Sequence, residues 1–332
     1  MKDKVKIGMI SFAHSHAFTF LNELMNRSDV VVTGVYDESR ERVQSVTDRY
    51  GLTFYGNHAE LLAADVDAVV ICSENARHAP LALDAAAAGK HVLCEKPLAT
   101  TIADMRAMIA ACRDSGVQLM TAYPCRYLPA VAEAKTAVDR GEIGRLLAIK
   151  GTNRGRMSGR WFVDRALSGG GAIMDHTVHL MDLMNWFTGS VPVEVYAEAG
   201  TLFHRELDVE DAAMIHVRYA DGVIGVLDPS WSRVPSYPGS ADVAMHVIGT
   251  DGAIELNAFA QRNEVYRNDK PRAEWSYWGD GMERFMIGEF VEAVKEGRNV
   301  AVTGEDGLRS AAVAVAAYES SRTGKPVPLV LS

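Results

Sequence analysis

The 332-residue sequence is poor in cysteine and has no long apolar stretch. Its four cysteines are scattered without a C-x-x-C pair, which excludes a disulfide framework and a cysteine zinc site and favours buried thiols in a reducing compartment. No apolar run reaches the roughly 18 residues that a membrane-spanning helix needs, and no signal-peptide core follows Met1. These absences predict a cytoplasmic protein that crosses no membrane.

The sequence also lacks an excess of positive charge. It has 43 acidic and 34 basic residues, which give a formal net charge of −9. An acidic surface repels phosphate backbones, so nucleic acid is not an expected partner. Hydrophobic residues make up 48% and charged residues 23% of the chain, which is typical of an ordered globular protein and not of a disordered chain or a coiled coil. The length predicts two domains.

Residues 1–122 alternate between short apolar runs and segments with helical periodicity. The apolar runs predict strands at Val5–Ile10, Val30–Tyr36, Ala68–Cys72, His91–Cys94 and Val117–Ala122. The segments between them predict helices at His16–Asn26, Ser39–Tyr50, Pro80–Ala88 and Ile102–Ser115. Continuous apolar strands are typical of a parallel sheet covered on both faces. Residues 1–122 are therefore predicted to form a doubly wound α/β domain of the Rossmann type.

Residues 123–332 follow a different rhythm, with apolar and polar residues alternating in the strands. Strands are predicted at Leu146–Gly151, Val193–Ala199, Ala213–Tyr219, Val223–Asp228, Val243–Ile248 and Ala253–Leu256. Helices are predicted at Pro129–Arg140, Ala172–Phe187, Phe285–Glu296 and Glu305–Arg322. Two of the joints, Asp221-Gly222 and Asp251-Gly252, carry a dipeptide that strongly favours a hairpin. The pattern predicts an α+β domain on a largely antiparallel open sheet.

An open sheet leaves one face that needs a cover. The sequence places apolar residues such as Val243, Ala253 and Ile254 on the strands of this predicted sheet. Large exposed apolar patches usually mark an interface. A second copy of the chain is the expected cover, in a homodimer or homotetramer.

The turn after the first predicted strand is where a doubly wound sheet would bind a dinucleotide. A G-x-G-x-x-G fingerprint would fall on Ser11, Ala13 and His16, so all three of its glycines are missing. Ser11 and Ala13 are still small, whereas His16 is not. On this turn alone, a dinucleotide site and an ordinary strand–helix turn are equally open.

Asp37, at the end of the second predicted strand, favours the dinucleotide. A carboxylate at this place accepts hydrogen bonds from both hydroxyls of an adenosine ribose and repels a 2′-phosphate, so NAD is favoured over NADP. Arg40 lies close enough in the sequence to keep NADP open. The alternative is that Asp37 simply caps the following helix.

The tripeptide Glu95-Lys96-Pro97 follows the predicted strand His91–Cys94. Proline restricts Lys96 to an extended conformation, so no helix begins there. A lysine fixed at the carboxyl end of a buried parallel strand faces the ligand crevice, and the alternative is a surface lysine with a snorkelling stem. The position favours the first interpretation and makes Lys96 a catalytic candidate.

A second polar group lies in the predicted helix Ala172–Phe187, which follows Gly169–Gly171 and is otherwise largely apolar. Asp175, His179 and Asp182 stand at positions i, i+4 and i+7 and form one polar stripe. A buried carboxylate beside an imidazole predicts a functional pair. A satisfied core histidine is the alternative, but the triple glycine allows a backbone or a ligand to approach closely.

No metal ion is expected at this helix. His176 lies about 100° round the helix from Asp175, because successive residues are separated by that angle. A site formed by Asp175, His176 and His179 would therefore be poorly aimed. Neither a cysteine nor a further carboxylate is placed to complete the ligand set.

Together, these motifs resemble the Gfo/Idh/MocA oxidoreductases, the family of glucose–fructose oxidoreductase and inositol 2-dehydrogenase. The resemblance rests first on Glu95-Lys96-Pro97 and on Gly169–Gly171 with Asp175, His179 and Asp182. Further segments that fit the family are Ser73–His78, Arg126–Pro129, Trp161-Phe162, Glu210-Asp211, Ser230-Trp231 and Thr303–Gly307. The likeness covers nearly the whole chain, and the departure is the turn without glycine after the first strand.

The resemblance implies a Rossmann domain, a C-terminal α+β domain that often mediates oligomerisation, and a nicotinamide cofactor. It also implies a lysine, an aspartate and a histidine at the catalytic centre, which are Lys96, Asp175 and His179 in this sequence. The residues expected at the cofactor are Ser11, Phe12, Ala13, His14, His16, Asp37, Ser73, Asn75, His78, Glu95 and Lys96. The residues expected at the substrate are Lys96, Arg126, Trp161, Arg165, Asp175 and His179, with a surface role equally open for the two arginines.

The expected activity is NAD(P)-dependent hydride transfer to or from a secondary alcohol or ketone of a sugar, sugar acid or cyclitol. His179 is expected to take the hydroxyl proton, and the Lys96 ammonium to stabilise charge on the oxygen. Asp175 either orients His179 or accepts a neighbouring substrate hydroxyl. Two alternatives stay open: NAD-assisted elimination or glycosidic cleavage without net redox change, and a redox-silent protein that only binds a ligand.

Overall fold

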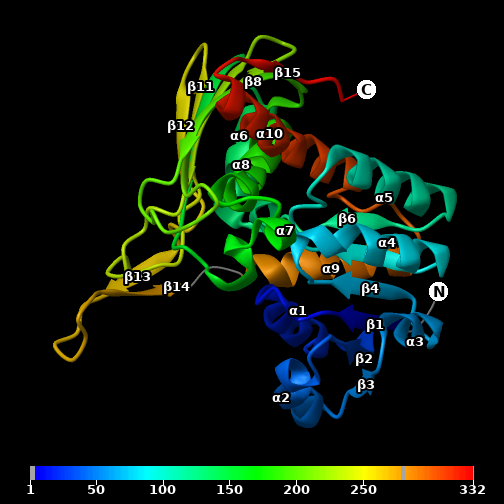
Figure 1. Cartoon of the computed structure of the whole chain (residues 1–332). Helices are drawn as coiled ribbons and strands as arrows, with labels where there is room; N and C mark the ends of the chain where they lie inside the picture. The colour runs from blue at the N-terminus through cyan, green and yellow to red at the C-terminus, as the bar shows by residue number, and fades with distance from the viewer. Residues whose placement is uncertain (1–3, 278–280, 332) are drawn as a thin grey trace. The chain divides into compact units, whose positions relative to one another are not determined.

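The computed structural model describes residues 4–277 and 281–331. The chain divides into two compact units, of which the first joins residues 1–124 to residues 283–308. The second joins residues 125–282 to residues 309–332. The chain therefore leaves the first unit and later returns to it (Figure 1). The sequence instead assigns the returning segment to a second domain that begins at residue 123.

A six-stranded parallel sheet forms the centre of the first unit, with the strand order β3-β2-β1-β4-β5-β6. Its strands are β1 (Val5–Ile10), β2 (Val30–Tyr36), β3 (Thr53–Tyr55), β4 (Ala68–Ile71), β5 (His91–Cys94) and β6 (Leu119–Thr121). All four residues of β4 are buried, as the continuous apolar runs predict for a covered parallel sheet. The strand order changes direction between β1 and β4, which is the switch point where doubly wound sheets bind ligands. This confirms the predicted Rossmann architecture.

Helices accompany these strands, and the sequence predicts most of them. They are α1 (His16–Met25), α2 (Arg40–Tyr50), α3 (His58–Ala63), α4 (His78–Ala87), α5 (Ile102–Asp114) and, after the chain has returned, α9 (Met282–Glu296). The hydroxyl of Thr101 caps α5 by accepting the N–H of Asp104 at 3.1 Å. The sequence did not predict β3 and α3, because elements of 3 and 6 residues carry too little periodicity.

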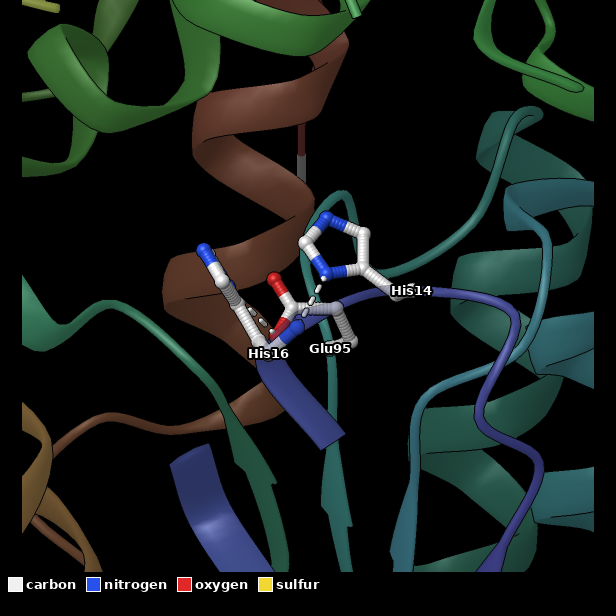
Figure 2. Close-up of side chains that lie close together, drawn as sticks. All are labelled: His14, His16 and Glu95. Atoms are coloured by element: carbon white, nitrogen blue, oxygen red, sulfur yellow. Dashed lines mark hydrogen bonds and ion pairs between the residues drawn. The ribbon is translucent and has the colours of Figure 1, made fainter. Parts of the chain in front are cut away.

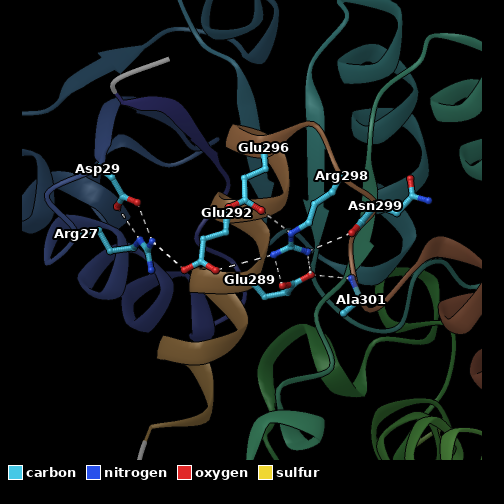
Figure 3. A network of polar contacts seen from close by, with 8 residues as sticks. All are labelled: Arg27, Asp29, Glu289, Glu292, Glu296, Arg298, Asn299 and Ala301. Carbon is cyan, nitrogen blue, oxygen red and sulfur yellow. Dashed lines mark hydrogen bonds and ion pairs between the residues drawn. The ribbon is translucent and has the colours of Figure 1, made fainter. Parts of the chain in front are cut away.

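Polar contacts tie the returning segment 283–308 to the first unit (Figure 3). Within the segment, Arg298, after α9, donates to both carboxylate oxygens of Glu289 at 2.7 Å and fixes the turn that follows the helix. Arg27, after α1, lies 3.7 Å from the carboxylate of Glu292. Backbone hydrogen bonds also join the segment to β6. Its place in the fold is set by these tertiary contacts, which a reading of elements in chain order does not reveal.

A seven-stranded sheet forms the second unit, with the order β12-β11-β7-β10-β9-β8-β15. Its strands are β7 (Leu146–Arg154), β8 (Pro192–Gly200), β9 (Ala212–Tyr219), β10 (Ile224–Ser230), β11 (Ala244–Gly249), β12 (Ala253–Asn257) and β15 (Val327–Pro328). Among the described strands, β10 pairs with β7 in parallel and the other neighbours are antiparallel, as predicted. The two Asp-Gly turns join β9 to β10 and β11 to β12, which confirms both hairpins. A separate pair, β13 (Arg262–Val265) and β14 (Glu274–Tyr277), was not predicted.

Helix α8 (Ala172–Thr188) contacts this sheet at β7, β9 and β10. The other helices of the unit are α6 (Pro129–Asp139), α7 (Arg165–Ser168) and most of α10 (Gly304–Thr323). Nearly every residue of α8 is buried, as predicted. Gly151 of β7 leaves room for it, since a Cβ there would lie 2.8 Å from Met184 and 2.9 Å from Leu180. Among the described residues, no helix has the length and apolarity needed to cross a bilayer.

The sequence suggests Val243, Ala253 and Ile254 as apolar residues in need of a cover, and the structure confirms only one of them as exposed. Val243 is only 3% exposed and belongs to the core. Ile254 packs against the same core because it pairs with the buried Val247 of β11. Ala253 is exposed, as expected. The larger exposed apolar side chains of the sheet are Met214 and Ile224, at 53% and 51%.

Candidate cofactor and active site

The turn between β1 and α1 keeps the shape of a dinucleotide-binding turn without its glycines. Ser11 has a φ of +66°, in the left-handed region that glycine normally occupies. Its hydroxyl accepts the N–H of Ala13 at 3.2 Å, a local bond that stabilises the turn. Ser11 therefore supplies the conformation of the first missing glycine with a different residue type.

The side chain of Asp37, just after β2, forms hydrogen bonds that stabilise this turn. Its buried carboxylate accepts the N–H of Phe12 at 2.6 Å, the N–H of Ser39 at 2.7 Å and the guanidinium of Arg42 at 3.1 Å. The bond to Ser39 lies just before α2, whose N-cap, Ser39, makes no side-chain cap bond, so Asp37 is not the cap of this helix. The bond to Phe12 shows that the same carboxylate also shapes the cofactor turn.

His14 and His16 lie next to Glu95, which follows β5 (Figure 2). Nδ1 of His14 accepts the backbone N–H of His16 at 3.2 Å, and Nδ1 of His16 lies 3.3 Å from Oε2 of Glu95. The backbone N–H of Lys96 donates to Oε1 of Glu95 at 3.1 Å. Burial by itself would raise the pKa of Glu95, but the charges of His14, His16 and Lys96 and the His16 hydrogen bond lower it below its ordinary value. Glu95 is therefore an ionised carboxylate that is almost wholly buried.

Lys96 follows β5 and is only 4% exposed. The peptide bond from Lys96 to Pro97 is cis. A buried ammonium is costly without a partner of opposite charge, and the ionised Glu95 beside it supplies a negative charge. The surface lysine with a snorkelling stem is therefore wrong for this residue.

His78 connects the segments that follow β4 and β5. Its Nδ1 lies 2.8 Å from the carbonyl oxygen of Pro97, and its Nε2 lies 3.2 Å from that of Ser73. Burial lowers the pKa of His78, although the two carbonyls and Glu95 act in the opposite direction. Ser73 and Asn75 are also buried. The fully buried His78 thus links the residue after Lys96 to Ser73 and helps to fix the position of the Lys96–Pro97 segment.

In the second unit, Asp182 of α8 forms a bidentate ion pair with Arg126 in the short helix η2 (Pro124–Tyr127). The two hydrogen bonds are 2.6 and 2.8 Å long, and both side chains are buried. The parallel fork geometry makes this one of the stronger kinds of ion pair. Arg126 has no surface role, since it is anchored to the stripe that the sequence identifies.

Asp175 and His179, the other members of the stripe, are one helical turn apart on α8. Oδ2 of Asp175 accepts the indole N–H of Trp231 at 3.1 Å and lies 3.3 Å from Nε2 of His176. Gly155 leaves room for His176, because a Cβ there would lie 2.6 Å from its ring. His179 is only partly buried, whereas Asp175 is buried. The expectation that Asp175 orients His179 stays a prediction.

The triple glycine Gly169–Gly171 allows close approach, as expected, and protein groups take the space. A Cβ on the second glycine would overlap with the hydroxyl of Tyr318, and one on Gly171 with the carbonyl oxygen of Glu210. The Glu210 carboxylate accepts the N–H groups of Gly171 and Ile173 at 2.9 and 3.0 Å and the Tyr318 hydroxyl at 2.8 Å. Burial raises the pKa of Glu210, although these hydrogen bonds lower it. Glu210 and Tyr318 therefore fix the start of the helix that carries Asp175 and His179.

Trp161 and Arg165, expected near the substrate, lie in different surroundings. Trp161 is 9% exposed and stacks on Phe162 with ring centroids 3.9 Å apart. Arg165 is exposed, and its guanidinium donates to the carbonyl oxygen of Asp208 at 2.8 Å. The indole is thus held by packing, whereas the guanidinium lies at the surface of the unit.

Comparison with known proteins identifies both units. Residues 5–123 match a family model described as an oxidoreductase family with an NAD-binding Rossmann fold. Residues 131–255 match the GFO/IDH/MocA C-terminal domain. The chain belongs to the Gfo/Idh/MocA oxidoreductase family.

Relatives within the Gfo/Idh/MocA family match along almost their whole length. The chain is 31% identical to an uncharacterized oxidoreductase of Bacillus subtilis, YrbE, over 90% of this chain and 89% of that protein. It is 27% identical to myo-inositol 2-dehydrogenase of Thermotoga maritima over 98% and 97% of the two chains. The solved structure of GenD2 from gentamicin A biosynthesis, in complex with NAD, superposes with a TM-score of 0.91 at 27% identity over 99% and 97%. The first unit is an NAD-binding Rossmann domain.

The turn of this Gfo/Idh/MocA oxidoreductase fits a dinucleotide in its backbone shape and small residues. Ser11 makes the sharp left-handed turn, and Ala13 adds only a methyl group. The N–H of His16, at the start of α1, is directed at the ring of His14. The pyrophosphate of a dinucleotide commonly lies at such a helix N-terminus.

Proposed function

We propose that the protein is an NAD(P)-dependent dehydrogenase acting on a secondary alcohol or ketone of a sugar, sugar acid or cyclitol. The observation that carries this proposal is the buried Lys96 beside the ionised Glu95, at the ligand-binding edge of the Rossmann sheet. Positioned charges in buried sites are typical of functional centres. The 27% identical myo-inositol 2-dehydrogenase supports the class of substrate.

In the proposed mechanism, NAD accepts or supplies the hydride when it is bound. Lys96 donates a hydrogen bond to the substrate oxygen and stabilises the negative charge that develops on it. His179 accepts the hydroxyl proton, since an imidazole titrates near neutral pH and its side chain is not fully buried. Asp175, fixed by Trp231, accepts a neighbouring substrate hydroxyl or orients His179.

The remaining candidate residues divide by their surroundings. We propose that the cofactor contacts the β1–α1 turn and the ends of β2, β4 and β5, through Ser11, Phe12, Ala13, His14, His16, Asp37, Ser73, Asn75, Glu95 and Lys96. His78 acts behind them as a positioning residue. Trp161 and Arg165 contact the substrate, and Arg126 acts through Asp182. NAD is preferred to NADP because the guanidinium of Arg40 lies over the ring of Phe54, 5.4 Å from its centroid.

We also propose that the protein forms a homo-oligomer through the outer face of the second sheet. Met214 and Ile224 are more than half exposed on neighbouring strands, which supports a covering subunit. Light scattering measures the mass directly, and a monomeric mass would refute this proposal. The four cysteines are buried and form no disulfide bond, which suits a cytoplasmic location.

The activity is tested by screening polyols, sugars and sugar acids for reduction of NAD and NADP, first with the parent protein and then with Lys96→Ala and His179→Ala. Each variant is expected to lower kcat by about 10²–10⁴-fold, the range for a lost general base or charge-stabilising group. Lys325→Ala and His58→Ala, both in surface positions, are the matched controls and should keep the parent rate.

Three outcomes would contradict the proposal. Turnover within a few-fold of the parent in Lys96→Ala refutes the assigned roles. Product without net reduction of the cofactor supports the lyase or glycosidase alternative. Binding of NAD, followed by tryptophan fluorescence, without turnover of any substrate supports a redox-silent protein.

A further inference from the structure

Three potential metal ligands meet at the β1–α1 turn, and the proposed hydride transfer does not need this arrangement. One ring nitrogen of His14, one of His16 and one carboxylate oxygen of Glu95 all lie within 4.8 Å of one another (Figure 2). Within residues 4–277 and 281–331, this is the group of histidine, cysteine and carboxylate side chains that meets this spacing. The sequence predicts no metal ion, and the possible ligands that stand out there are only Asp175, His176 and His179. This second group is not visible in the sequence, because His16 and Glu95 are 79 residues apart in the chain.

We propose that His14, His16 and Glu95 bind a divalent transition-metal ion of the zinc class, with the fourth ligand position open. Two imidazole nitrogens and one carboxylate oxygen form a ligand set that suits zinc, and three protein ligands with an open position are typical of its reactive sites. The same three residues are among those proposed to contact the cofactor, so the metal site concerns the protein without bound nucleotide and does not rest on the dehydrogenase activity.

The spacing of the ligands fits a small ion. Ligands that lie about 2.0–2.1 Å from a tetrahedral zinc ion are about 3.4 Å from each other. Nδ1 of His16 and Oε2 of Glu95 are 3.3 Å apart, so this pair is already at the required separation. A ring nitrogen of His14 lies within 4.8 Å of a ring nitrogen of His16 and of a carboxylate oxygen of Glu95.

The protonation of the ligands also suits a cation. The Glu95 side chain is 1% exposed, and its Oε2 is the oxygen that lies next to His16. Nδ1 of His14 accepts the backbone N–H of His16, so this nitrogen is an acceptor and not a donor in this arrangement.

The surrounding contacts hold the ligands in place. The backbone N–H of Lys96 holds Oε1 of Glu95 at 3.1 Å, which leaves Oε2 directed at His16. Such outer contacts commonly orient metal ligands. The N–H of His14 donates to the carbonyl oxygen of Cys72 at 2.9 Å and anchors the loop to the end of β4. The His16 side chain is 33% exposed, which provides a path of entry for an ion.

The test is a calorimetric titration of the full-length protein with Zn²⁺, after removal of metal with a chelator and in the absence of nucleotide and substrate. One ion per chain is expected, with the stoichiometry checked by elemental analysis. His14→Ala, His16→Ala and Glu95→Gln should each weaken binding by at least about 100-fold, because loss of a ligand exceeds the 10–100-fold effect of an outer partner. His58→Ala removes a histidine that pairs with Asp84 elsewhere and is the matched control.

Two results would overturn the proposal. One is the absence of zinc binding in the parent protein, and the other is binding that persists in all three ligand variants. His16→Ala keeps the test valid if a buried variant fails to fold, because this side chain is partly exposed. Since no nucleotide is present, failure here leaves the dehydrogenase proposal untouched, and failure of the activity screen leaves the metal site untouched.

Discussion

The turn before α1 and the turn before α8 are built in opposite ways. The first lacks all three glycines of the dinucleotide fingerprint, yet Ser11 adopts the left-handed conformation with a φ of +66°. The second has the glycines Gly169–Gly171, and the atoms that use the space belong to Tyr318 and Glu210. Glycine in a sequence thus indicates close approach without saying which group approaches. Its absence does not exclude the conformation that it usually serves.

Each of the two regions contains a buried glutamate, and the pKa values of these two glutamates are shifted in opposite directions. Glu95 lies among cationic groups, which lower its pKa. Glu210 meets neutral donors, two N–H groups and a phenol, and its pKa is raised because burial outweighs them. Two buried carboxylates can therefore have opposite pKa shifts, and the difference between these two comes from the charge of the neighbouring groups.

The largest expected effect is a loss of stability on replacing Gly171, the last of the three glycines, because packing against its neighbours leaves no room for a side chain. Gly171→Ala would place a Cβ against the carbonyl oxygen of Glu210. We expect the free energy of unfolding to fall by about 3 kcal/mol, near the upper end for overpacking a buried position. Urea denaturation measures it. Gly56→Ala is the control, since its Cβ would lie 3.5 Å from the Glu60 carboxylate, and an equal loss in both variants would contradict the packing argument.

The second prediction compares the two carboxylates through the pH dependence of stability. Burial raises the pKa of Glu210 above its ordinary value of 4.5 in the folded protein. In the pH window just above 4.5, the folded chain therefore keeps a proton on Glu210 that the unfolded chain has already lost. Its contribution to stability is therefore lost as the pH rises through that window. Glu95 has a lowered pKa, so its contribution is present above 4.5 and is lost as the pH falls below it.

Urea denaturation between pH 3 and pH 8 separates the two carboxylates. Glu210→Gln should remove the fall in stability on the alkaline side of the window, and Glu95→Gln should remove the fall on the acidic side. Each variant serves as the control for the other. The comparison fails if both variants change the same side of the profile.

The smallest expected effect concerns the strain of the glycine-free turn. Ser11→Gly and Ser11→Ala both lose the hydrogen bond from the N–H of Ala13. Only alanine keeps a Cβ in the left-handed region, which costs about 1 kcal/mol. The glycine variant should therefore be the more stable of the two by about that amount in thermal or urea unfolding. Equal stabilities would show that the Cβ at this turn is not strained.

The long elements of the fold could be predicted from the sequence, because their periodicity is local. The bounds of β1, β2 and β5 match the predicted runs, and α8 ends one residue after its prediction. The place of residues 283–308 could not be predicted. It depends on contacts such as that of Arg27 with Glu292 and on backbone bonds to β6, which pattern and propensity do not encode.

The candidate site divides in the same way. The position of Lys96 after an apolar strand was enough to predict its burial, and the spacing on α8 was enough to predict the polar stripe. Tyr318 carries no local signal, because it is 144 residues from Met174, whose N–H it accepts. The meeting of His14 and His16 with Glu95 depends on strand order, since β1 and β5 both flank β4.

Thr121 of the edge strand β6 donates hydrogen bonds to the carbonyl oxygens of residues 302 and 303, which has a consequence for synthesis. A ribosome releases residues 1–124 first, and the strands β7 to β14 emerge before residue 303 does. Until then the β6 edge of the parallel sheet lacks these partners. An uncovered strand edge can pair with the wrong strand, so we expect this edge to be exposed for most of the time that the chain is being made.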